Sequence, residues 1–377
     1  MVITMDKPTI QDIFIRYGEE YTQKYKLSNQ QWKLYHSIRN CKTGGLGIHI
    51  ITCKNCAKTT KGNNSCRNRH CPMCQSYARE KWIQKQLMNQ LNCSYFHIVT
   101  TIPHELNELI QYNDKEIYQI LFQANSEAIL ELASDKKWLG AKVGITSMIH
   151  TWGQKLDFHP HIHSIVTGGG LRHHRWISCE KDYLFQVQVL SSLFKGKVLT
   201  YLKEVELKLP NHLSHLKNKK AMNDFLRPLY KKDWVANITS TKGSPEAIIE
   251  YLGRYAFRVA IANERILDIE NGQVTFEYKD NKDNEKRKKM TLSAIEFIRR
   301  FLMHILPANF MKIRSFGIFS NRTKNTLIKL CRILLRQIMM SDFTIKIKRK
   351  LHKFKCEKCG GEHFHYQFLY AFHPLLQ

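Results

Sequence analysis

The stretch DFHPHIHSIVTGGG, from Asp157 to Gly170, places three histidines within five residues, ahead of a β-branched run and three glycines. Side chains alternate between the two faces of an extended strand. His159, His161 and His163 are therefore expected on one face, with Ile162 on the other. The apolar run predicts that this other face is buried, and the glycines predict the end of the strand. A row of imidazoles is compatible with a metal site and equally with a solvent-exposed strand, because short motifs of this kind are common.

The segments before this stretch predict the order strand, helix, hairpin. Residues 95–103 (YFHIVTTIP) alternate as a strand, and a long helix is expected from about 105 to 136. Residues 143–152 (VGITSMIHTW) form a second strand, joined to the histidine strand by a turn around 155–158. This order indicates an α+β fold.

Other segments predict mainly helices. Residues 8–40 are amphipathic, with Ser28 as a helix N-cap, and residues 76–92 form a basic helix. A helix is also expected to begin at Ser244, with Pro245 at its first position. Further expected elements are helices at 186–205, 219–230 and 293–306, a strand at 234–240 and a hairpin within 274–293.

The composition indicates a polyanionic partner. The chain has 377 residues and a formal net charge of +27, from 59 Lys and Arg against 32 Asp and Glu. Such an excess favours nucleic acid first and an anionic membrane surface second. No stretch approaches the roughly 18 apolar residues of a membrane helix, and the N-terminus lacks a signal-peptide core. We therefore expect a cytoplasmic, nucleoid-associated protein without a membrane partner.

The cysteines indicate metal binding. Six of the eleven cysteines lie between Cys41 and Cys74, and disulfides are rare in a reducing compartment. The segment CKNCAKTTKGNNSCRNRHCPMC contains two C-x2-C pairs separated by fourteen residues. This spacing predicts one closed, tetrahedral, structural Zn²⁺ site. Its ligands would be Cys53, Cys56, Cys71 and Cys74.

Two further groups of ligand-type residues leave the number of zinc ions open. One group lies within or just before the first module and either binds a second zinc or lies buried beside the first. It consists of Cys41, His49, Cys66 and His70. The other is a C-terminal C-x2-C pair, Cys356 and Cys359, with His363 and His365 nearby.

Tyr251 and Tyr255 are four residues apart on the helix expected after Ser244, hence on one face. Taken alone, such a pair is more typical of a core or a groove than of a nucleophile. Combined with a histidine metal site, it suggests a definite chemistry. A divalent ion polarises a phosphodiester, and tyrosine attacks phosphorus to leave a covalent 5′-phosphotyrosine.

An H-x-H strand followed by a Y-x3-Y helix resembles the HUH endonuclease superfamily. The segments SCRNRHCPMCQ, HTWGQKLDFHPHIH, YLGRY and EFIRRFL together resemble the two-tyrosine transposases of the insertion sequence ninety-one family. The resemblance implies a nuclease with a ferredoxin-like antiparallel sheet, an N-terminal zinc-binding domain, and rolling-circle transposition through single-stranded DNA at the element ends. It also implies that His161 and His163 bind the catalytic metal and that Tyr251 and Tyr255 are the nucleophiles.

The sequence offers three candidates for a third ligand of the catalytic metal. We favour Gln154, with His150 and His159 as alternatives. The expected ion is Mg²⁺ or Mn²⁺, since the site must bridge phosphate oxygens and exchange its ligands.

We expect three domains. Residues 1–92 would form a helical and zinc-binding N-terminal domain, residues 93–268 the HUH endonuclease domain with its tyrosine helix, and residues 269–377 a basic C-terminal domain. The oligomeric state stays open between monomer and dimer.

Three functions are compatible with these residues. The first is a transposase that nicks and joins single-stranded DNA. The second is an HUH replication initiator or relaxase, which uses the same chemistry. The third is a non-catalytic zinc-containing DNA-binding regulator, which metal-dependent nicking would exclude.

Overall fold

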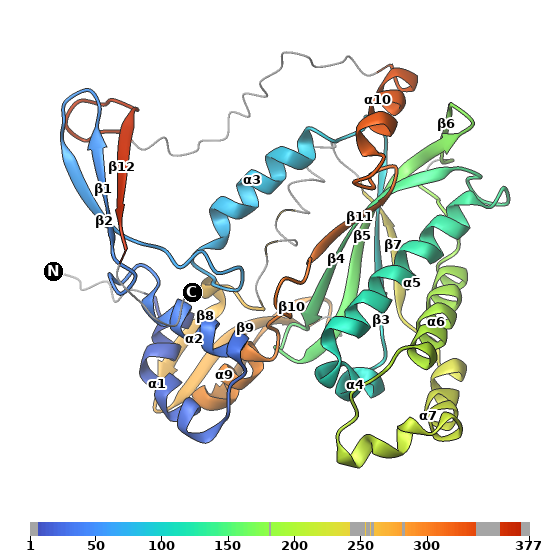
Figure 1. Cartoon of the computed structure of the whole chain (residues 1–377), viewed down its shortest axis with the longest axis horizontal. Coiled ribbons are helices and arrows are strands. Elements are labelled where there is room, and N and C mark those ends of the chain that lie inside the picture. The colour runs from blue at the N-terminus through green and yellow to red at the C-terminus, as the bar shows by residue number, and fades with distance from the viewer. Residues whose placement is uncertain are drawn as a thin grey trace. The chain divides into compact units, whose positions relative to one another are not determined.

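An antiparallel sheet carries the histidine-rich stretch in the computed structural model of the chain (Figure 1). The structure describes residues 7–180, 182–241, 253, 257, 260–280, 283–336 and 355–370. The strand order of this six-stranded sheet, here the β5 sheet, is β11-β4-β5-β3-β7, with β6 paired to β5. Its strands are β3 (Tyr95–Thr101), β4 (Lys142–Trp152), β5 (Phe158–Arg172), β6 (Arg175–Ser178), β7 (Ala236–Ser240) and β11 (Ile313–Gly317).

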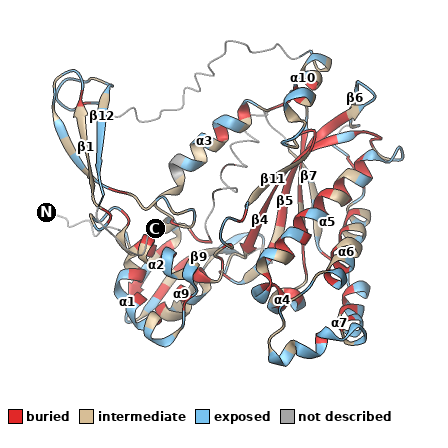
Figure 2. Cartoon of the chain, viewed as in Figure 1, coloured by how far each residue is buried: buried red, intermediate tan, exposed pale blue. Residues whose placement is uncertain are grey.

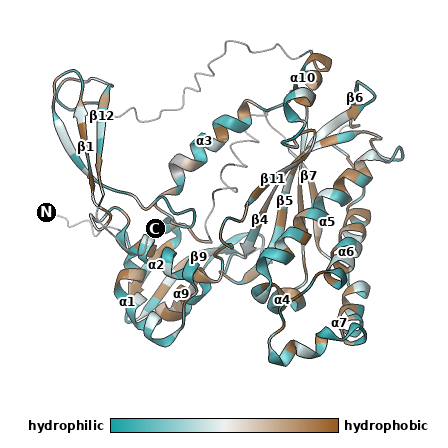
Figure 3. Cartoon of the chain, in the orientation of Figure 1, coloured by the Kyte–Doolittle hydropathy of each residue, from teal (hydrophilic) through white to brown (hydrophobic). Residues whose placement is uncertain are grey.

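Helices cover one face of the β5 sheet. They are α4 (Asn107–Tyr112), α5 (Asp114–Ser134) and α6 (Val187–Glu204), and α7 (Lys219–Lys231) packs against α6. Ile162 and Val166 of β5 are buried in the core that these helices share with the sheet. Figure 2 shows β4 and β5 largely in the buried colour, and Figure 3 shows hydrophobic residues gathered along the strands. Because neighbouring side chains alternate, the odd-numbered histidines of β5 lie on the opposite face.

The glycines do not end the histidine strand, contrary to the expectation from the sequence. β5 continues to Arg172, and Gly170 pairs with Val143 of β4 and with Ile177 of β6. A Cβ at Gly170 would lie 2.5 Å from the carbonyl oxygen of Lys142. The glycines therefore permit close approach of neighbouring backbone rather than a turn.

The strand, helix and hairpin order is confirmed, and so is the α+β fold class with antiparallel sheets. The basic helix appears as α3 (Gln75–Leu87). A smaller cluster of buried residues joins Leu91 to Ile318 and to Ile328 of α10 (Lys324–Leu334).

The N-terminal helices pack with a later meander of strands. The N-terminal helices are α1 (Ile10–Lys24) and α2 (Asn29–Asn40). The later segment consists of β8 (Ile266–Glu270), β9 (Gln273–Asp280), β10 (Lys286–Ser293) and the helix α9 (Ala294–Leu302). Ser28 caps α2 as expected, because its side chain accepts a hydrogen bond from the Gln31 backbone. Phe14 of α1 meets Phe301 of α9 edge to face, with ring centroids 5.5 Å apart.

A second small sheet joins distant parts of the sequence. Its strand order is β12-β1-β2, from β1 (Ile48–Cys53), β2 (Thr59–Asn63) and β12 (Phe364–Leu369), and it is here called the β1 sheet. Figure 1 shows β12, in red, beside β1, in blue. This pairing was not predicted from the sequence.

The chain divides into two units, neither of them continuous in sequence. One comprises residues 1–78, 257–305 and 340–377, and the other residues 79–256 and 306–339. The contiguous boundaries expected at residues 92 and 268 differ from this division, because chain segments after residue 256 return to the first unit. No helix in the described part of the chain has the length and apolar character needed to cross a membrane.

Candidate functional site

Three histidines meet on the face of the β5 sheet opposite its helices. His150 of β4 pairs directly with His161 of β5, and His163 follows two residues later on the same face. One ring nitrogen from each of the three lies within 4.8 Å of the others. His150 and His163 are buried, and His161 is partly buried. These three residues are called the histidine cluster below.

Neighbouring groups fix the orientation of these rings. Nε2 of His97, on β3, shares a hydrogen bond of 2.9 Å with Nδ1 of His163. Nδ1 of His161 donates to the carbonyl oxygen of His159 at 2.6 Å. Trp152 stacks on His150 with ring centroids 4.6 Å apart. Because Nδ1 is engaged in both His161 and His163, ligation by either residue falls to its Nε2.

His161 of the cluster and the neighbouring His97 have the protonation state that metal binding requires. Burial lowers the pKa of His161 to about 4 and that of His97 to about 4. Both rings are therefore neutral at pH 7, which is the form of imidazole that binds metal. Mg²⁺ prefers oxygen ligands. Of the two predicted ions, Mn²⁺ is thus the better match to three nitrogens.

The histidine cluster includes His161 and His163, together with His150, which was an alternative third ligand. Gln154, the favoured one, lies in the turn between β4 and β5, and its role stays a prediction. His159 is exposed, and its ring centroid lies 5.4 Å from that of His161. His97 was not among the residues predicted from the sequence. Its position in the alternating strand YFHIVTTIP, on the same face as His163 once β3 pairs with β5, was the available signal.

Tyr251 and Tyr255, and the helix start at Ser244, lie outside the described residues. Gly253, between the two tyrosines, is described and is helical. A Cβ at Gly253 would lie 2.3 Å from the side chain of Ile83 on α3. This part of the motif thus packs closely against α3.

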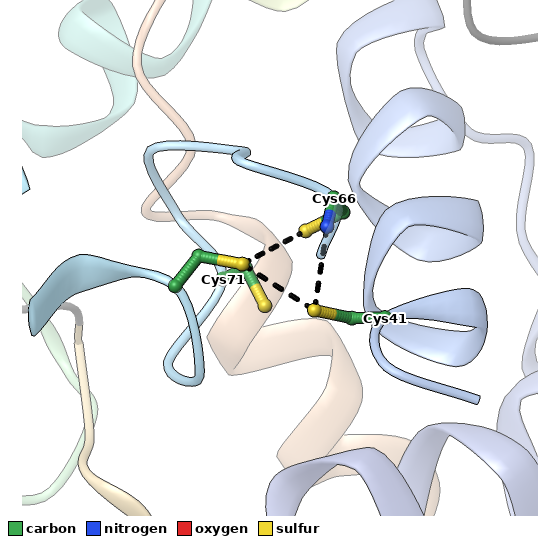
Figure 4. A group of neighbouring side chains, drawn as sticks. Cys41, Cys66 and Cys71 are labelled. Atoms are coloured by element: carbon green, nitrogen blue, oxygen red, sulfur yellow. Dashed lines mark hydrogen bonds between the residues drawn. The ribbon is translucent and has the colours of Figure 1, made fainter. Parts of the chain in front are cut away.

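Four cysteines form the first thiol cluster, here called thiol cluster 1: Cys41, Cys66, Cys71 and Cys74. Figure 4 shows the first three of them. Sγ of Cys74 lies 3.3 Å from that of Cys41 and 3.5 Å from that of Cys66. These distances exceed the bond length of a disulfide, about 2.05 Å. They are close to the edge of a tetrahedron with Zn–S bonds of about 2.3 Å, which is roughly 3.8 Å. The hydrogen bond with Cys41 lowers the pKa of the Cys74 thiol.

The other cysteines that were predicted as zinc ligands form thiol cluster 2, which consists of Cys53, Cys56, Cys356 and Cys359. The expected grouping of Cys53 and Cys56 with Cys71 and Cys74 is therefore corrected: each pair belongs to a different cluster. The reason is geometric. β1 ends at Cys53 and pairs with β12, so Cys53 and Cys56 lie beside the C-terminal cysteines. Cys41, at the end of α2, lies beside Cys71 and Cys74 instead.

The predicted zinc-ligand histidines lie outside both thiol clusters. Nδ1 of His49 is 3.1 Å from Oδ1 of Asn64, and the backbone N–H of His70 donates to Asn68. His365 pairs with Thr52 in the β1 sheet, and the backbone carbonyl of His363 accepts a hydrogen bond from Lys54.

This chain resembles known proteins over most of its length. A family model described as "Putative transposase" matches residues 144–326, and one described as "Transposase zinc-binding domain" matches residues 13–102. The putative transposase y4qJ of Sinorhizobium fredii (strain NBRC 101917 / NGR234) is 40% identical over 335 residues, 87% of this chain and 84% of the relative. The transposase for insertion sequence element IS801 of Pseudomonas savastanoi pv. phaseolicola is 29% identical over 289 residues, 75% of this chain and 68% of the relative. No solved structure matches the chain.

Proposed function

Because this chain belongs to the insertion sequence ninety-one family of transposases, we propose that it nicks and rejoins single-stranded DNA through a 5′-phosphotyrosine intermediate. The family implies an enzyme that cleaves DNA and transfers strands. The observation that carries the finer proposal is the histidine cluster, whose three ligand nitrogens lie within 4.8 Å of one another.

In this proposal His161 and His163, with either His150 or Gln154, hold the catalytic ion. A bound Mn²⁺ or Mg²⁺ would supply positive charge that polarises the scissile phosphate. His97 holds the ring of His163 in one orientation through their hydrogen bond. Trp152 does the same for His150 by stacking.

Tyr251 or Tyr255 then acts as the nucleophile. Its Oη attacks phosphorus, the bond from phosphorus to the 3′-oxygen breaks, and a 3′-hydroxyl leaves while the 5′ end stays attached to tyrosine. The tyrosine proton passes to water or to the leaving oxygen, since an unperturbed phenol is protonated at neutral pH. Attack by another 3′-hydroxyl reverses these steps and joins two strands. Two tyrosines permit two such transfers.

Thiol cluster 1 is proposed to hold the structural Zn²⁺ of the family's zinc-binding domain, since all four of its cysteines fall within residues 13–102. The backbone N–H of Cys66 points at Sγ of Cys41, and that of Asn68 at Sγ of Cys66, each at 3.5 Å. Such hydrogen bonds stabilise thiolates.

A hollow on the β1 sheet supports a single-stranded DNA partner. It has a volume of about 190 Å³, and its lining includes Lys42, Arg67, Phe368 and Tyr370. The rings of Phe368 and Tyr370 are stacked at 6.0 Å, and the Arg67 guanidinium lies 5.5 Å from the Phe368 centroid. Cationic groups beside exposed aromatic rings bind phosphates and stack on unpaired bases.

Covalent capture tests this proposal. We expect a labelled single-stranded oligonucleotide, incubated with Mn²⁺, to become attached to the protein at Tyr251 or Tyr255, as mapped by peptide mass spectrometry. Either single Phe replacement should retain some nicking, whereas the double replacement should form no adduct.

His161→Ala should abolish nicking and retain DNA binding, because phosphate contacts come from Lys and Arg elsewhere. His215→Ala, an exposed histidine far from this cluster in sequence, is the matched control. An adduct at another residue, or full nicking by His161→Ala, contradicts the proposal, and no nicking at all with either ion favours a DNA-binding regulator.

A further inference from the structure

Thiol cluster 2 joins two segments that lie 300 residues apart. Sγ of Cys56 is 3.5 Å from that of Cys356, and Sγ of Cys53 is 3.6 Å from that of Cys359. All four cysteines are free rather than disulfide-bonded. As in thiol cluster 1, these separations are near the roughly 3.8 Å edge of a tetrahedral Zn–thiolate site.

The two C-x2-C turns have the same backbone hydrogen bonds. The N–H of Ala57 donates to the carbonyl of Cys53 at 2.9 Å, and the N–H of Gly360 donates to that of Cys356 at 2.7 Å. Each turn also has a hydrogen bond in the opposite direction. The N–H of Cys53 donates to the carbonyl of Lys58, and the N–H of Cys356 donates to the carbonyl of Gly361, both at 2.9 Å. These are two copies of one turn, facing each other.

The backbone dihedral angles repeat as well. Ala57 has a φ of 57° and Gly360 a φ of 69°, and both occupy the fourth position after the first cysteine of their turn. Glycine adopts this left-handed conformation at no steric cost, whereas alanine adopts it only when its surroundings require it. A strained Ala57 is explained if the turn must direct two thiols toward one point.

The β1 sheet contains almost no hydrophobic core of its own. The side chains of β1 are of intermediate exposure except Cys53, those of β2 are intermediate or exposed, and those of β12 are mostly exposed. Cys53 and Cys356, by contrast, have relative exposures of only 1% and 6%. A small sheet that buries little apolar surface needs another source of stability, and a structural metal is one of the few available.

We propose that Cys53, Cys56, Cys356 and Cys359 bind a second structural Zn²⁺, which fastens the C-terminal segment to the N-terminal zinc-binding region. Four thiolates in a closed tetrahedral arrangement suit Zn²⁺ and leave no open position for catalysis. The ion pair between Lys58 and Glu357, at 2.9 Å, joins the same two turns from outside. The zinc-binding domain of the family ends at residue 102, so two of these four ligands lie beyond it.

Metal content tests the proposal without any activity assay. The purified full-length chain should contain two zinc ions, one for each thiol cluster, as measured by mass spectrometry of the metal. Cys356→Ser with Cys359→Ser should reduce the content to one. Retention of that one ion shows that the variant has folded around thiol cluster 1. Cys179→Ser, a cysteine outside both clusters, should retain two. One zinc in the wild-type chain, unchanged in the double variant, overturns the proposal.

A cut chain tests the fastening itself. A protease site inserted at residue 345 allows the full-length folded protein to be cleaved between the two halves of thiol cluster 2. The C-terminal fragment should co-elute with the rest of the chain on a gel-filtration column, and it should be released by a zinc chelator or by Cys53→Ser with Cys56→Ser. A fragment that stays bound after zinc has been removed, or that separates while zinc is present, contradicts the fastening role. Neither outcome depends on whether the protein cleaves DNA.

Discussion

The surroundings of His163 show how neighbouring side chains orient one of the proposed metal ligands. Its Nδ1 is occupied by the hydrogen bond to His97, and its ring contacts His150 and His161, with centroids 4.6 and 4.8 Å away. The residue is therefore confined to one rotamer and one ligating nitrogen. Its neighbour Ser164, on the other face, hydrogen-bonds to Asn125 of α5 at 2.8 Å, which anchors the strand beneath the site.

We expect His97→Ala to weaken binding of the catalytic ion rather than to remove it. Loss of a group that orients a metal ligand typically costs about 10–100-fold in metal affinity or activity. In nicking assays, the Mn²⁺ concentration for half-maximal rate should therefore rise about 10–100-fold, and the rate should recover at high Mn²⁺.

His97→Gln is the control for this prediction, because a glutamine amide can replace the ring nitrogen as a hydrogen-bond partner of His163. It should restore most of the metal affinity. A rate that stays low at saturating Mn²⁺ in His97→Ala would show instead that the residue acts on the substrate or on folding.

At the scale of elements, strand β5 depends on its glycines. Gly170→Ala should destabilise the unit that contains the β5 sheet, because the new Cβ would lie 2.5 Å from the backbone oxygen of Lys142, which cannot move independently. Overpacking of this kind costs about 1–3 kcal/mol. Thermal unfolding of the purified variant measures the effect.

Gly196→Ala provides the matched control. Gly196 lies within α6, and apart from its chain neighbours and the backbone of its own helix, no atom of the described residues lies within 4 Å of a Cβ added there. Alanine stabilises a helix interior by roughly 0.5–1 kcal/mol relative to glycine. The unfolding temperature should therefore rise in Gly196→Ala and fall in Gly170→Ala. Equal shifts would mean that the glycine strand is not closely packed.

Local elements were predictable from the sequence, whereas contacts between distant elements were not. Ser28 and the alternation around Ile162 carry their own signals, since capping and strand periodicity are local. The spacing of two C-x2-C pairs is the same whether they share one ion or bind two, so it does not reveal that Cys53 joins Cys356. The histidine strand could likewise be predicted, with its histidines on one face, but the position of His97 required knowledge of which strand pairs with β5.

At the scale of the whole molecule, we expect net charge to dominate the interaction with DNA. A chain of charge +27 should bind single-stranded DNA with an affinity that falls steeply with salt, because binding releases counterions from the phosphates. We expect a loss of about tenfold or more between roughly 50 and 200 mM salt. Fluorescence anisotropy of a labelled oligonucleotide over this range measures the slope.

The part of the affinity that does not depend on salt should come from DNA bases that stack on aromatic side chains. An uncharged base analogue strand, such as a peptide nucleic acid of the same sequence, is a suitable control, since it retains bases and lacks phosphates. Its binding should be weaker and nearly independent of salt. If DNA and the uncharged strand show the same salt dependence, the phosphates do not carry the binding.

The pairing of β1 with β12 has a consequence for how the protein is made. A ribosome adds about 5–20 residues per second, so Cys356 follows Cys56 by roughly 15–60 s. During that interval β1 and β2 form only a two-stranded hairpin, which is marginally stable in water. A chain whose translation stops before residue 356 never receives its third strand and keeps Cys53 and Cys56 exposed to proteases and oxidants. Completion of the β1 sheet therefore waits until the segment that carries Cys356 and β12 has been synthesised.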